Sequence, residues 1–378
     1  MTFSISWSII SIADMGLDLH TAHMSIPSFI RRDVALAPKT SLKLGGAAEF
    51  FAGLDHLSQL ADVVAFARQR GLPICVLGGG SNVIVPDGGV DGVVVQLQAS
   101  ELEFSASSSA VSVTVDSGAD WDRFVDSVVE KGWAGLECLT GIPGLVGATP
   151  IQNVGAYGQD VSETITGVEV FDLETGRTRT YSNKQCGFDY RSSVFKRMDR
   201  QRYVVLRVTF RLIPGGAPTV TYRDLKARLG DSPSLMDVKK TVRDVRQQKS
   251  MLAGGFDENR CSAGSFFINP IVSDSVFAEV REIFLSDGGE LSDLPSWHTP
   301  KGIKLAAAWL IERAGFAKGF QVGRMGLSTK HSLALVHLGH GTTQELLEFA
   351  RLIADGVQSK WGVRLEREPR ILRGASLS

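Results

Sequence analysis

The chain has 378 residues, 43% of them hydrophobic, which is enough to bury a large core in two or three domains. Lys and Arg number 40 and nearly cancel 41 Asp and Glu, which excludes a general nucleic-acid binder with its basic excess. The four cysteines are far apart and form no CxxC motif, so they indicate reduced thiols rather than disulfides or a zinc site.

The first segment, residues 1–30, is predicted to be a poorly ordered extension. The first Lys or Arg of the chain is Arg31, just beyond this segment, so the positively charged start of a secretory signal peptide is missing. No apolar run in the chain approaches the roughly 20 residues of a membrane span. We therefore expect a cytoplasmic protein without a membrane partner.

Strand and helix signals alternate up to residue 215. The helical spacing of apolar residues predicts helices at 56–69 and 121–130. Buried or alternating Val-rich runs predict strands, and a Gly-containing turn at 174–176 predicts a hairpin. The predicted strands are 73–77, 93–95, 111–115, a hairpin over 168–181, and 203–212.

Helical patterns dominate beyond residue 215. Helices are predicted at 235–247, 304–313 and 343–360, with a strand at 333–336 and a final strand at 363–372. This order of elements predicts an α+β protein of at least two lobes, divided near 215–235.

Two glycine-rich segments are candidates for ligand contact. The run Gly78-Gly79-Gly80-Ser81-Asn82 follows a buried strand, and its backbone N–H groups can converge on an anion. It matches neither GxGxxG nor a Walker A loop, so taken alone it is better interpreted as a plain tight turn. The segment 141–158 carries five glycines among apolar residues, which neither a helix nor a strand favours. We interpret the two segments as embracing one extended cofactor, with an irregular loop as the alternative.

Three polar side chains are candidates for chemistry. Ser265, in AGSFFINP, is predicted to lie on a tight turn within an apolar wall, and its surroundings lack the G-x-S-x-G elbow of a hydrolase. Arg191, after Tyr190, can bind a carboxylate as a planar fork, although such an arginine often only packs its stem. Glu368 taken alone would be a solvated side chain of the terminal strand.

The histidines give no sign of a metal site. His331, His337 and His340 are near one another, but no ligand spacing such as HExxH accompanies them. We interpret them as structural or solvated and expect no bound metal.

Together these motifs resemble the UDP-N-acetylenolpyruvoylglucosamine reductase (MurB) family of bacterial cell-wall synthesis, over roughly residues 36–374. The resemblance is carried by LGGGSN (77–82), the glycine run 141–158, YRSSVFK (190–196), AGSFFINP (263–270), KLAAAWLI (304–311) and LERE (365–368). The chain departs from the family pattern in a longer loop at 251–260, in Ile268, and in His337, where Asn is usual.

The resemblance implies an α+β architecture with an FAD-binding fold of the PCMH/vanillyl-alcohol-oxidase type. The FAD-binding region of two subdomains would cover 31–230, and a separate α+β substrate-binding domain would cover 231–360. Residues 361–378 would form a C-terminal strand that returns to the FAD-binding lobe and brings Glu368 to the active site.

The resemblance also implies site residues. Ser265 would donate a proton, and Arg191 and Glu368 would bind the substrate carboxylate. FAD, held non-covalently, would contact Gly78, Gly79, Gly80, Ser81, Asn82, Ile142, Pro143, Gly144, Gly147, Ala148, Ile151, Gly155 and Arg370. The substrate would contact Tyr157, Tyr190, Tyr222, Arg246, Lys249 and Asn269.

The implied activity is the NADPH-dependent, FAD-mediated reduction of UDP-N-acetylglucosamine enolpyruvate to UDP-N-acetylmuramate, by a monomer, for peptidoglycan synthesis. Two alternatives stay open: another PCMH-type FAD oxidoreductase that acts on a sugar or alcohol, and a non-catalytic flavin-binding protein. No histidine lies between His56 and His298, so covalent attachment of FAD to a histidine near the first glycine run is unsupported. Cys75 is close to that run but falls in a predicted buried strand.

Overall fold

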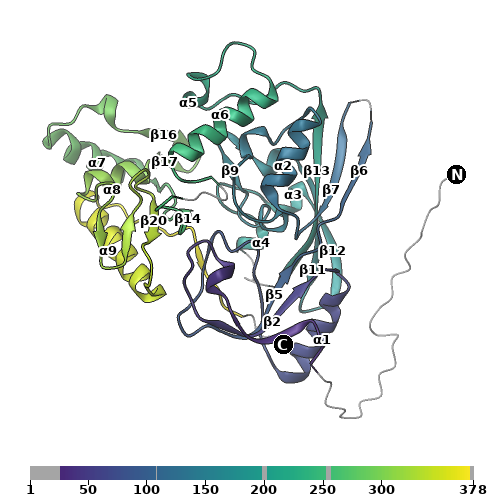
Figure 1. The fold of residues 1–378 in the computed structure, drawn as a ribbon. Helices are drawn as coiled ribbons and strands as arrows, with labels where there is room; N and C mark the ends of the chain where they lie inside the picture. Colours follow the sequence, from purple (N-terminus) through teal and green to yellow (C-terminus); the bar gives the residue numbers. More distant parts are fainter. Residues whose placement is uncertain (1–25, 108, 198–201, 253–256, 375–378) are drawn as a thin grey trace.

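The computed structural model describes residues 26–107, 109–197, 202–252 and 257–374. The chain forms a first lobe (purple in Figure 1), a second lobe around a large sheet (blue to teal) and a third region (green to yellow). Residues 1–25 of the expected N-terminal extension lie outside the described residues, and Ile30 already begins the first strand.

The first lobe is a four-stranded sheet in the order β1-β2-β5-β3, covered by one helix. The Val-rich run 93–95 is fully buried at its centre, as expected for a strand paired in parallel on both sides. The elements are β1 (Ile30–Ala35), β2 (Ala47–Leu54), α1 (Gln59–Arg70), β3 (Ile74–Val76), β4 (Val83–Ile84) and β5 (Val90–Leu97).

The second lobe is built on an antiparallel sheet in the order β12-β11-β13-β7-β6, with β8 also paired to β13. Helix α2 lies on this sheet, and its N-cap is Asp120, whose side chain accepts a hydrogen bond from the Arg123 N–H. The strands are β6 (Leu102–Ala106), β7 (Val111–Asp116), β8 (Trp133–Ala134), β9 (Gly155–Ala156), β10 (Gln159–Asp160), β11 (Ile165–Asp172), β12 (Arg177–Ser182) and β13 (Tyr203–Pro214). The helices are α2 (Trp121–Glu130), α3 (Asn183–Cys186), α4 (Val194–Arg197), α5 (Arg223–Lys226) and α6 (Leu235–Gln248).

Helix α6 packs on this second lobe, although it falls inside the expected substrate-binding domain 231–360. Its Val238 and Val242 join a buried cluster with Cys138, and its Arg243 forms an ion pair with Asp122 at 2.8 Å. We therefore propose that the domain boundary lies after α6 rather than at residue 231.

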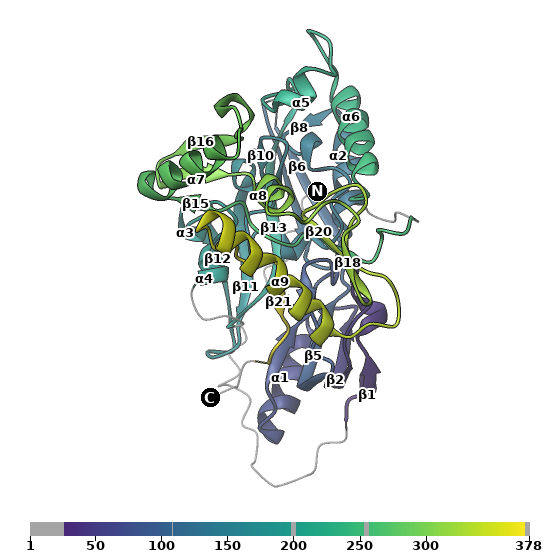
Figure 2. The same ribbon diagram turned by 90° about the vertical axis from the view of Figure 1, so that its left-hand side faces the viewer.

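The third region contains two small antiparallel sheets, β14-β20-β19-β18 and β15-β17-β16, covered by helices. The long helix α9 begins with a capping box between Thr342 and Glu345 and ends at Gly362 in the left-handed conformation. The elements are β14 (Ser262–Ser265), β15 (Ile271–Val272), α7 (Asp274–Ser286), β16 (Ser296–Thr299), β17 (Gly302–Leu305), α8 (Ala307–Arg313), β18 (Gln321–Val322), β19 (Met325–Leu327), β20 (Ala334–His337) and α9 (Thr343–Trp361). Figure 2 shows α9 crossing the molecule in front of the sheet of the second lobe.

Two predicted boundaries in the C-terminal half are wrong. Lys304 belongs to β17, where it pairs with Ile271 and Trp297, so the helix predicted at 304–313 begins only at Ala307. The segment predicted as a strand over 363–372 is regular only at β21 (Arg370–Ile371). Its backbone changes partners on either side of Pro369, from Phe267 at Arg367 to β4 in the first lobe.

The third region docks on the first lobe through specific polar contacts. The ring of the buried His337 makes a hydrogen bond to the Leu42 carbonyl at 3.0 Å, and its Nε2 accepts the Gly341 N–H at 2.9 Å. Asp87 accepts the N–H groups of Thr343 and Gln344 at the start of α9. His337 is thus structural, as interpreted from the sequence.

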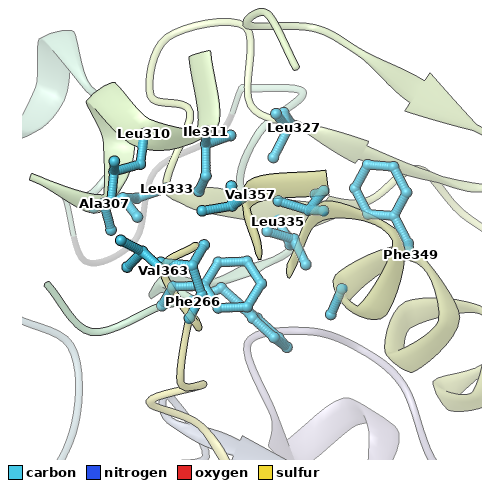
Figure 3. Close-up of a cluster of buried hydrophobic side chains, with 14 of the residues drawn as sticks. Phe266, Ala307, Leu310, Ile311, Leu327, Leu333, Leu335, Phe349, Val357 and Val363 are labelled. Atoms are coloured by element: carbon cyan, nitrogen blue, oxygen red, sulfur yellow. The ribbon is translucent and has the colours of Figure 1, made fainter. Parts of the chain in front are cut away.

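The largest hydrophobic cluster fills the third region and reaches into the first lobe through three side chains, Leu42, Leu44 and Ile84. Phe266 is fully buried in this cluster, beside Val363 and Leu335 in Figure 3. The residue next to Ser265 is therefore held by core packing.

We predict that Phe266→Ala lowers the free energy of unfolding by about 3–5 kcal/mol, because it removes a buried ring and leaves a cavity. Denaturant-induced unfolding measures the change. The control, Phe104→Ala, removes a ring that is 62% exposed and should cost less than about 1 kcal/mol. Equal losses in the two variants would contradict this assignment of the core.

Candidate active site

One cavity of about 1590 Å³ lies where the first lobe, the second lobe and the third region meet. Ser265, Arg191 and Glu368 all line it, although they are far apart in the chain. Both glycine-rich segments line the same cavity, as do all predicted cofactor- and substrate-contacting residues except Gly147. The structure therefore brings the candidate residues together at a single site.

Ser265 is the last residue of β14, and the tight turn predicted for it is wrong. β14 carries one extra residue relative to β20 between the pairs Ser262–Val336 and Ser265–Ala334. Gly264 adopts φ +69° at this bulge, which a residue with a Cβ rarely does. Because a bulge re-aims the neighbouring side chain, it accounts for a serine at the cavity wall.

Arg191 is held in an unusual backbone conformation. Two hydrogen bonds between Asp189 and Ser192 close a short turn, in which Arg191 has φ +49°. Its carbonyl accepts a hydrogen bond from Lys196 Nζ at 2.7 Å, and its Nη2 donates to the Gly155 carbonyl at 2.7 Å. A left-handed arginine persists only where its surroundings enforce it, and such strain is concentrated at functional sites.

Glu368 is mostly buried and paired, unlike the solvated side chain that the terminal strand alone suggested. Its side chain is 13% exposed, and its Oε1 lies 3.6 Å from Arg191 Nε. Gln152 Nε2 donates to the same oxygen at 3.1 Å. The Glu368 N–H donates to the Phe266 carbonyl at 2.8 Å, so the backbone that carries the carboxylate is bonded beside Ser265.

The first glycine run fits an anionic pyrophosphate. Within the part of the chain that the structure describes, the backbone N–H groups of residues 78–82 donate no hydrogen bond to another residue. These five residues line the cavity, and a row of backbone N–H groups without a protein partner is a typical anion-binding arrangement. The loop is kept in shape by Ser81 Oγ, which donates to the Pro143 carbonyl at 2.9 Å, and by Asn82 Nδ2, which donates to Gln152 Oε1 at 2.8 Å.

The two glycine-rich segments touch each other. A Cβ added to Gly79 would lie 2.8 Å from the Gly144 Cα, so the approach depends on the missing side chain. Gly147 instead packs on Ser117, where a Cβ would lie 2.3 Å from the Ser117 Cβ, and it does not line the cavity. The structure therefore shows a packing role for Gly147, and its cofactor contact stays a prediction.

One end of the cavity is rich in cationic groups. Arg246 is buried and donates to the Gly141 carbonyl at 2.9 Å, and burial lowers its pKa. Burial also lowers the pKa of Lys249. The rings of Tyr157 and Tyr222 meet edge to face at 5.5 Å between centroids. Two cations and two aromatic rings in the wall of one cavity suit a large anionic ligand.

Sequence reasoning missed several side chains of the cavity wall. Lys304 lies 5.1 Å from the centroid of the Tyr190 ring. Burial, together with the neighbouring Lys249 and Lys318, lowers the pKa of His331 to about 4. Gln152 lies within the glycine segment 141–158, and its position between glycines could have marked it as a residue of the cavity wall. The others become visible only when the third region folds against the second.

Asn269 is shared between the site and a helix end. Its Oδ1 accepts the N–H of Ala307 at 2.9 Å and so caps the start of α8, and burial raises the pKa of Tyr190, a rise that the Asn269 side chain opposes. The hydrogen bond to the start of α8 thus fixes the side chain of Asn269, for which a substrate contact is predicted.

The residues that the structure describes contain no group of three or more His, Cys, Asp or Glu side chains arranged to hold a metal ion. Among the same residues, no helix combines the length and hydrophobicity that a membrane crossing requires.

Comparison with known proteins agrees with this site. A model described as "FAD binding domain" matches residues 48–182, and one described as "UDP-N-acetylenolpyruvoylglucosamine reductase, C-terminal domain" matches residues 257–372. The fold and the glycine-lined cavity therefore define an FAD-binding oxidoreductase, and the expected α+β, PCMH-type architecture is confirmed.

Relatives identify the family. A UDP-N-acetylenolpyruvoylglucosamine reductase of Thermobifida fusca is 43% identical over 353 residues, which cover 92% of this chain and 98% of that protein. The enzyme of that name from Saccharopolyspora erythraea is 44% identical over 344 residues, 89% of this chain and 93% of that protein. This chain belongs to the UDP-N-acetylenolpyruvoylglucosamine reductase family. The crystal structure of the MurB reductase from Thermus caldophilus shares the fold, with a TM-score of 0.63 and 24% identity over 91% of this chain and 99% of that one.

We predict that Gly79→Ala weakens FAD binding at least about tenfold, because the new Cβ forces the two glycine segments apart. Flavin absorbance per mole of purified protein and titration of the flavin-stripped protein measure the effect. The control is Gly88→Ala in a nearby turn, where an added Cβ meets nothing within 4 Å. Equal flavin affinity in both variants would contradict the proposed approach of the two segments.

Proposed function

We propose that the chain catalyses the NADPH-dependent reduction of UDP-N-acetylglucosamine enolpyruvate to UDP-N-acetylmuramate, with FAD as the cofactor. The observation that carries this proposal is the convergence of Ser265, Arg191 and Glu368 on one cavity, whose wall includes the backbone N–H groups of residues 78–82, unpaired within the described part of the chain. Family membership supports the same reaction, because the relatives carry the name of this reductase.

FAD, when bound, supplies the hydride for the enolpyruvyl double bond and is recharged by NADPH. The free N–H groups of residues 78–82 would hold its pyrophosphate, and Gly144 and Gly155 would allow close approach of its remaining parts. The Arg370 N–H donates to the Asn82 carbonyl at 3.3 Å, so the C-terminal segment supports the same loop.

Arg191 would bind the carboxylate that is conjugated with the double bond of the substrate. Addition of a hydride to the terminal carbon places negative charge on this carboxylate, and a fixed guanidinium stabilises that charge without reorganising. The hydrogen bond from Arg191 Nη2 to the Gly155 carbonyl and the ion pair with Glu368 keep the guanidinium in place. Glu368 would contact the same substrate group.

Ser265 would donate the proton to the carbon next to the carboxylate. A serine hydroxyl is a weak acid, so it protonates only a strongly basic centre, and an enolate-like carbon is such a centre. Its position at the bulge of β14, beside the backbone of Glu368, supports this role.

Arg246, Lys249, Tyr157 and Tyr222 would bind the nucleotide diphosphate of the substrate. Since NADPH is also a large anion, the two ligands would take turns in one cavity, which predicts ping-pong kinetics. We further propose that the enzyme works as a monomer in the cytoplasm and serves cell shape and cell division through peptidoglycan precursors.

The alternative flavin oxidoreductases with covalently attached FAD find no support here. Burial raises the pKa of the Cys75 thiol to about 12, so this cysteine near the first glycine run is unreactive. FAD should therefore leave the protein on denaturation, and flavin that stays with the unfolded chain would favour that alternative. Bleaching of the purified yellow protein by NADPH, followed by recovery on addition of the enolpyruvyl sugar, separates the reductase from a non-catalytic flavoprotein.

We predict that Ser265→Ala slows reoxidation of the reduced flavin by the enolpyruvyl sugar at least about 100-fold, because the proton donor is lost. Reduction of the flavin by NADPH should stay nearly unchanged in stopped-flow measurements. Ser286→Ala, on the surface of α7, serves as the control. If both half-reactions slow equally, Ser265 is not the proton donor.

We predict that Arg191→Lys raises the barrier of substrate reduction by at least about 2 kcal/mol, a roughly 30-fold slower rate, because lysine cannot present a planar fork. Single-turnover kinetics measure the rate. Arg197→Lys in the same segment is the control, since Arg197 is exposed and its hydrogen bonds within the described residues go to Ser192 and Gly187. A near-normal rate for Arg191→Lys would rule out two-pronged binding of the carboxylate.

A further inference from the structure

A row of hydrogen-bonded side chains runs along the cavity wall behind Glu368. Asn82 Nδ2 donates to Gln152 Oε1 at 2.8 Å, and Gln152 Nε2 donates to Glu368 Oε1 at 3.1 Å. All three side chains line the cavity, and they come from three separate parts of the chain. The reaction proposed above assigns no role to Gln152.

The direction of every hydrogen bond in this row follows from the carboxylate. An ionised Glu368 only accepts, so the Gln152 amide must turn its nitrogen toward it. The Gln152 oxygen then faces Asn82, whose amide must turn its own nitrogen toward that oxygen. Neither amide can rotate by 180° without losing a hydrogen bond, so the row holds one arrangement.

The two donors around Glu368 meet at the same oxygen. Gln152 Nε2 and Arg191 Nε both approach Oε1, at 3.1 Å and 3.6 Å. Among the residues that the structure describes, none donates a hydrogen bond to Glu368 Oε2. The carboxylate is therefore oriented through one oxygen, and the other is left for a ligand in the cavity.

We propose that Gln152 is a positioning residue that fixes the rotation of the Glu368 carboxylate, so that Oε2 faces the enolpyruvyl group of the substrate. Asn82 sets the orientation of Gln152 and belongs to the glycine run that would hold the FAD pyrophosphate. The two hydrogen bonds thereby connect the Glu368 carboxylate with the glycine run 78–82. The inference deepens the function proposed above and rests on it for its catalytic consequence.

The contact between Gln152 and Glu368 is tested by exchanging the amide and the carboxylate between the two positions. The full-length protein is used as purified, and its flavin content is measured. At pH 8, Gln152→Glu places a second carboxylate against Glu368 and should lower the melting temperature by about 3 °C or more. In the background of Glu368→Gln, the same substitution restores an amide–carboxylate pair and should cause a much smaller drop. An equal drop in both backgrounds overturns the proposal.

The catalytic consequence is tested with Gln152→Leu in separate half-reactions. Reoxidation of the reduced flavin by the enolpyruvyl sugar should slow at least about tenfold, with NADPH-driven bleaching within about twofold of the original rate. Gln344→Leu removes a matched amide–carboxylate hydrogen bond, to Glu348 on the surface of α9, and should change neither rate.

Equal slowing of both half-reactions by Gln152→Leu, or no slowing of either, contradicts the positioning role. If the reduced flavin of the unsubstituted protein is not reoxidised by the enolpyruvyl sugar, the proposed function fails. The melting comparison still decides in that case whether Gln152 positions Glu368, because it requires no substrate.

Discussion

The geometry of the site depends on the backbone hydrogen bonds of a short C-terminal segment, residues 366–372. On one side, the Glu368 N–H donates to the Phe266 carbonyl and the Glu366 carbonyl accepts the Ile268 N–H. On the other side, the N–H groups of residues 370 and 372 donate to the carbonyls of Asn82 and Ile84 in the first lobe. One segment thus connects the strand that carries Ser265 with the glycine run, and it places Glu368 between them.

Charge and burial in the cavity follow from this arrangement. Arg191 and Glu368 are partly removed from water, where an unpaired charge would be costly, and each lies close to the other. Asp160 lies in the same wall, where burial raises its pKa and the nearby Arg191 and Lys304 oppose that rise. The Gly155 carbonyl and Glu368 hold the guanidinium, and Lys196, Lys304, Arg246 and Lys249 add cationic charge to the same cavity wall, which attracts an anionic substrate.

The elements with a strong periodic pattern could be predicted from the sequence. Helix α2 spans the residues predicted for it, and α6, α9 and β13 differ by one or two residues at their ends. The errors occurred where tertiary pairing overrides local preference. Lys304 precedes a helix-forming run but pairs with two strands, and residues 363–369 have strand-like composition without a continuous partner. Helix α6 resembles the helical C-terminal half in composition, yet its apolar face packs on the second lobe.

The sequence by itself determined the chemistry that is available here: the glycine spacing, the hydroxyl among apolar residues, the arginine after Tyr190 and the glutamate near the end. These features are local, because backbone freedom and side-chain type are properties of single residues and their neighbours. Only the tertiary structure decided that Glu368 is oriented through one oxygen by Gln152 and Arg191, and that Gly147 packs rather than lines the cavity. Hydrogen bonds between residues more than 200 positions apart leave no periodic trace in the chain, since their partners become neighbours only when the three regions pack together.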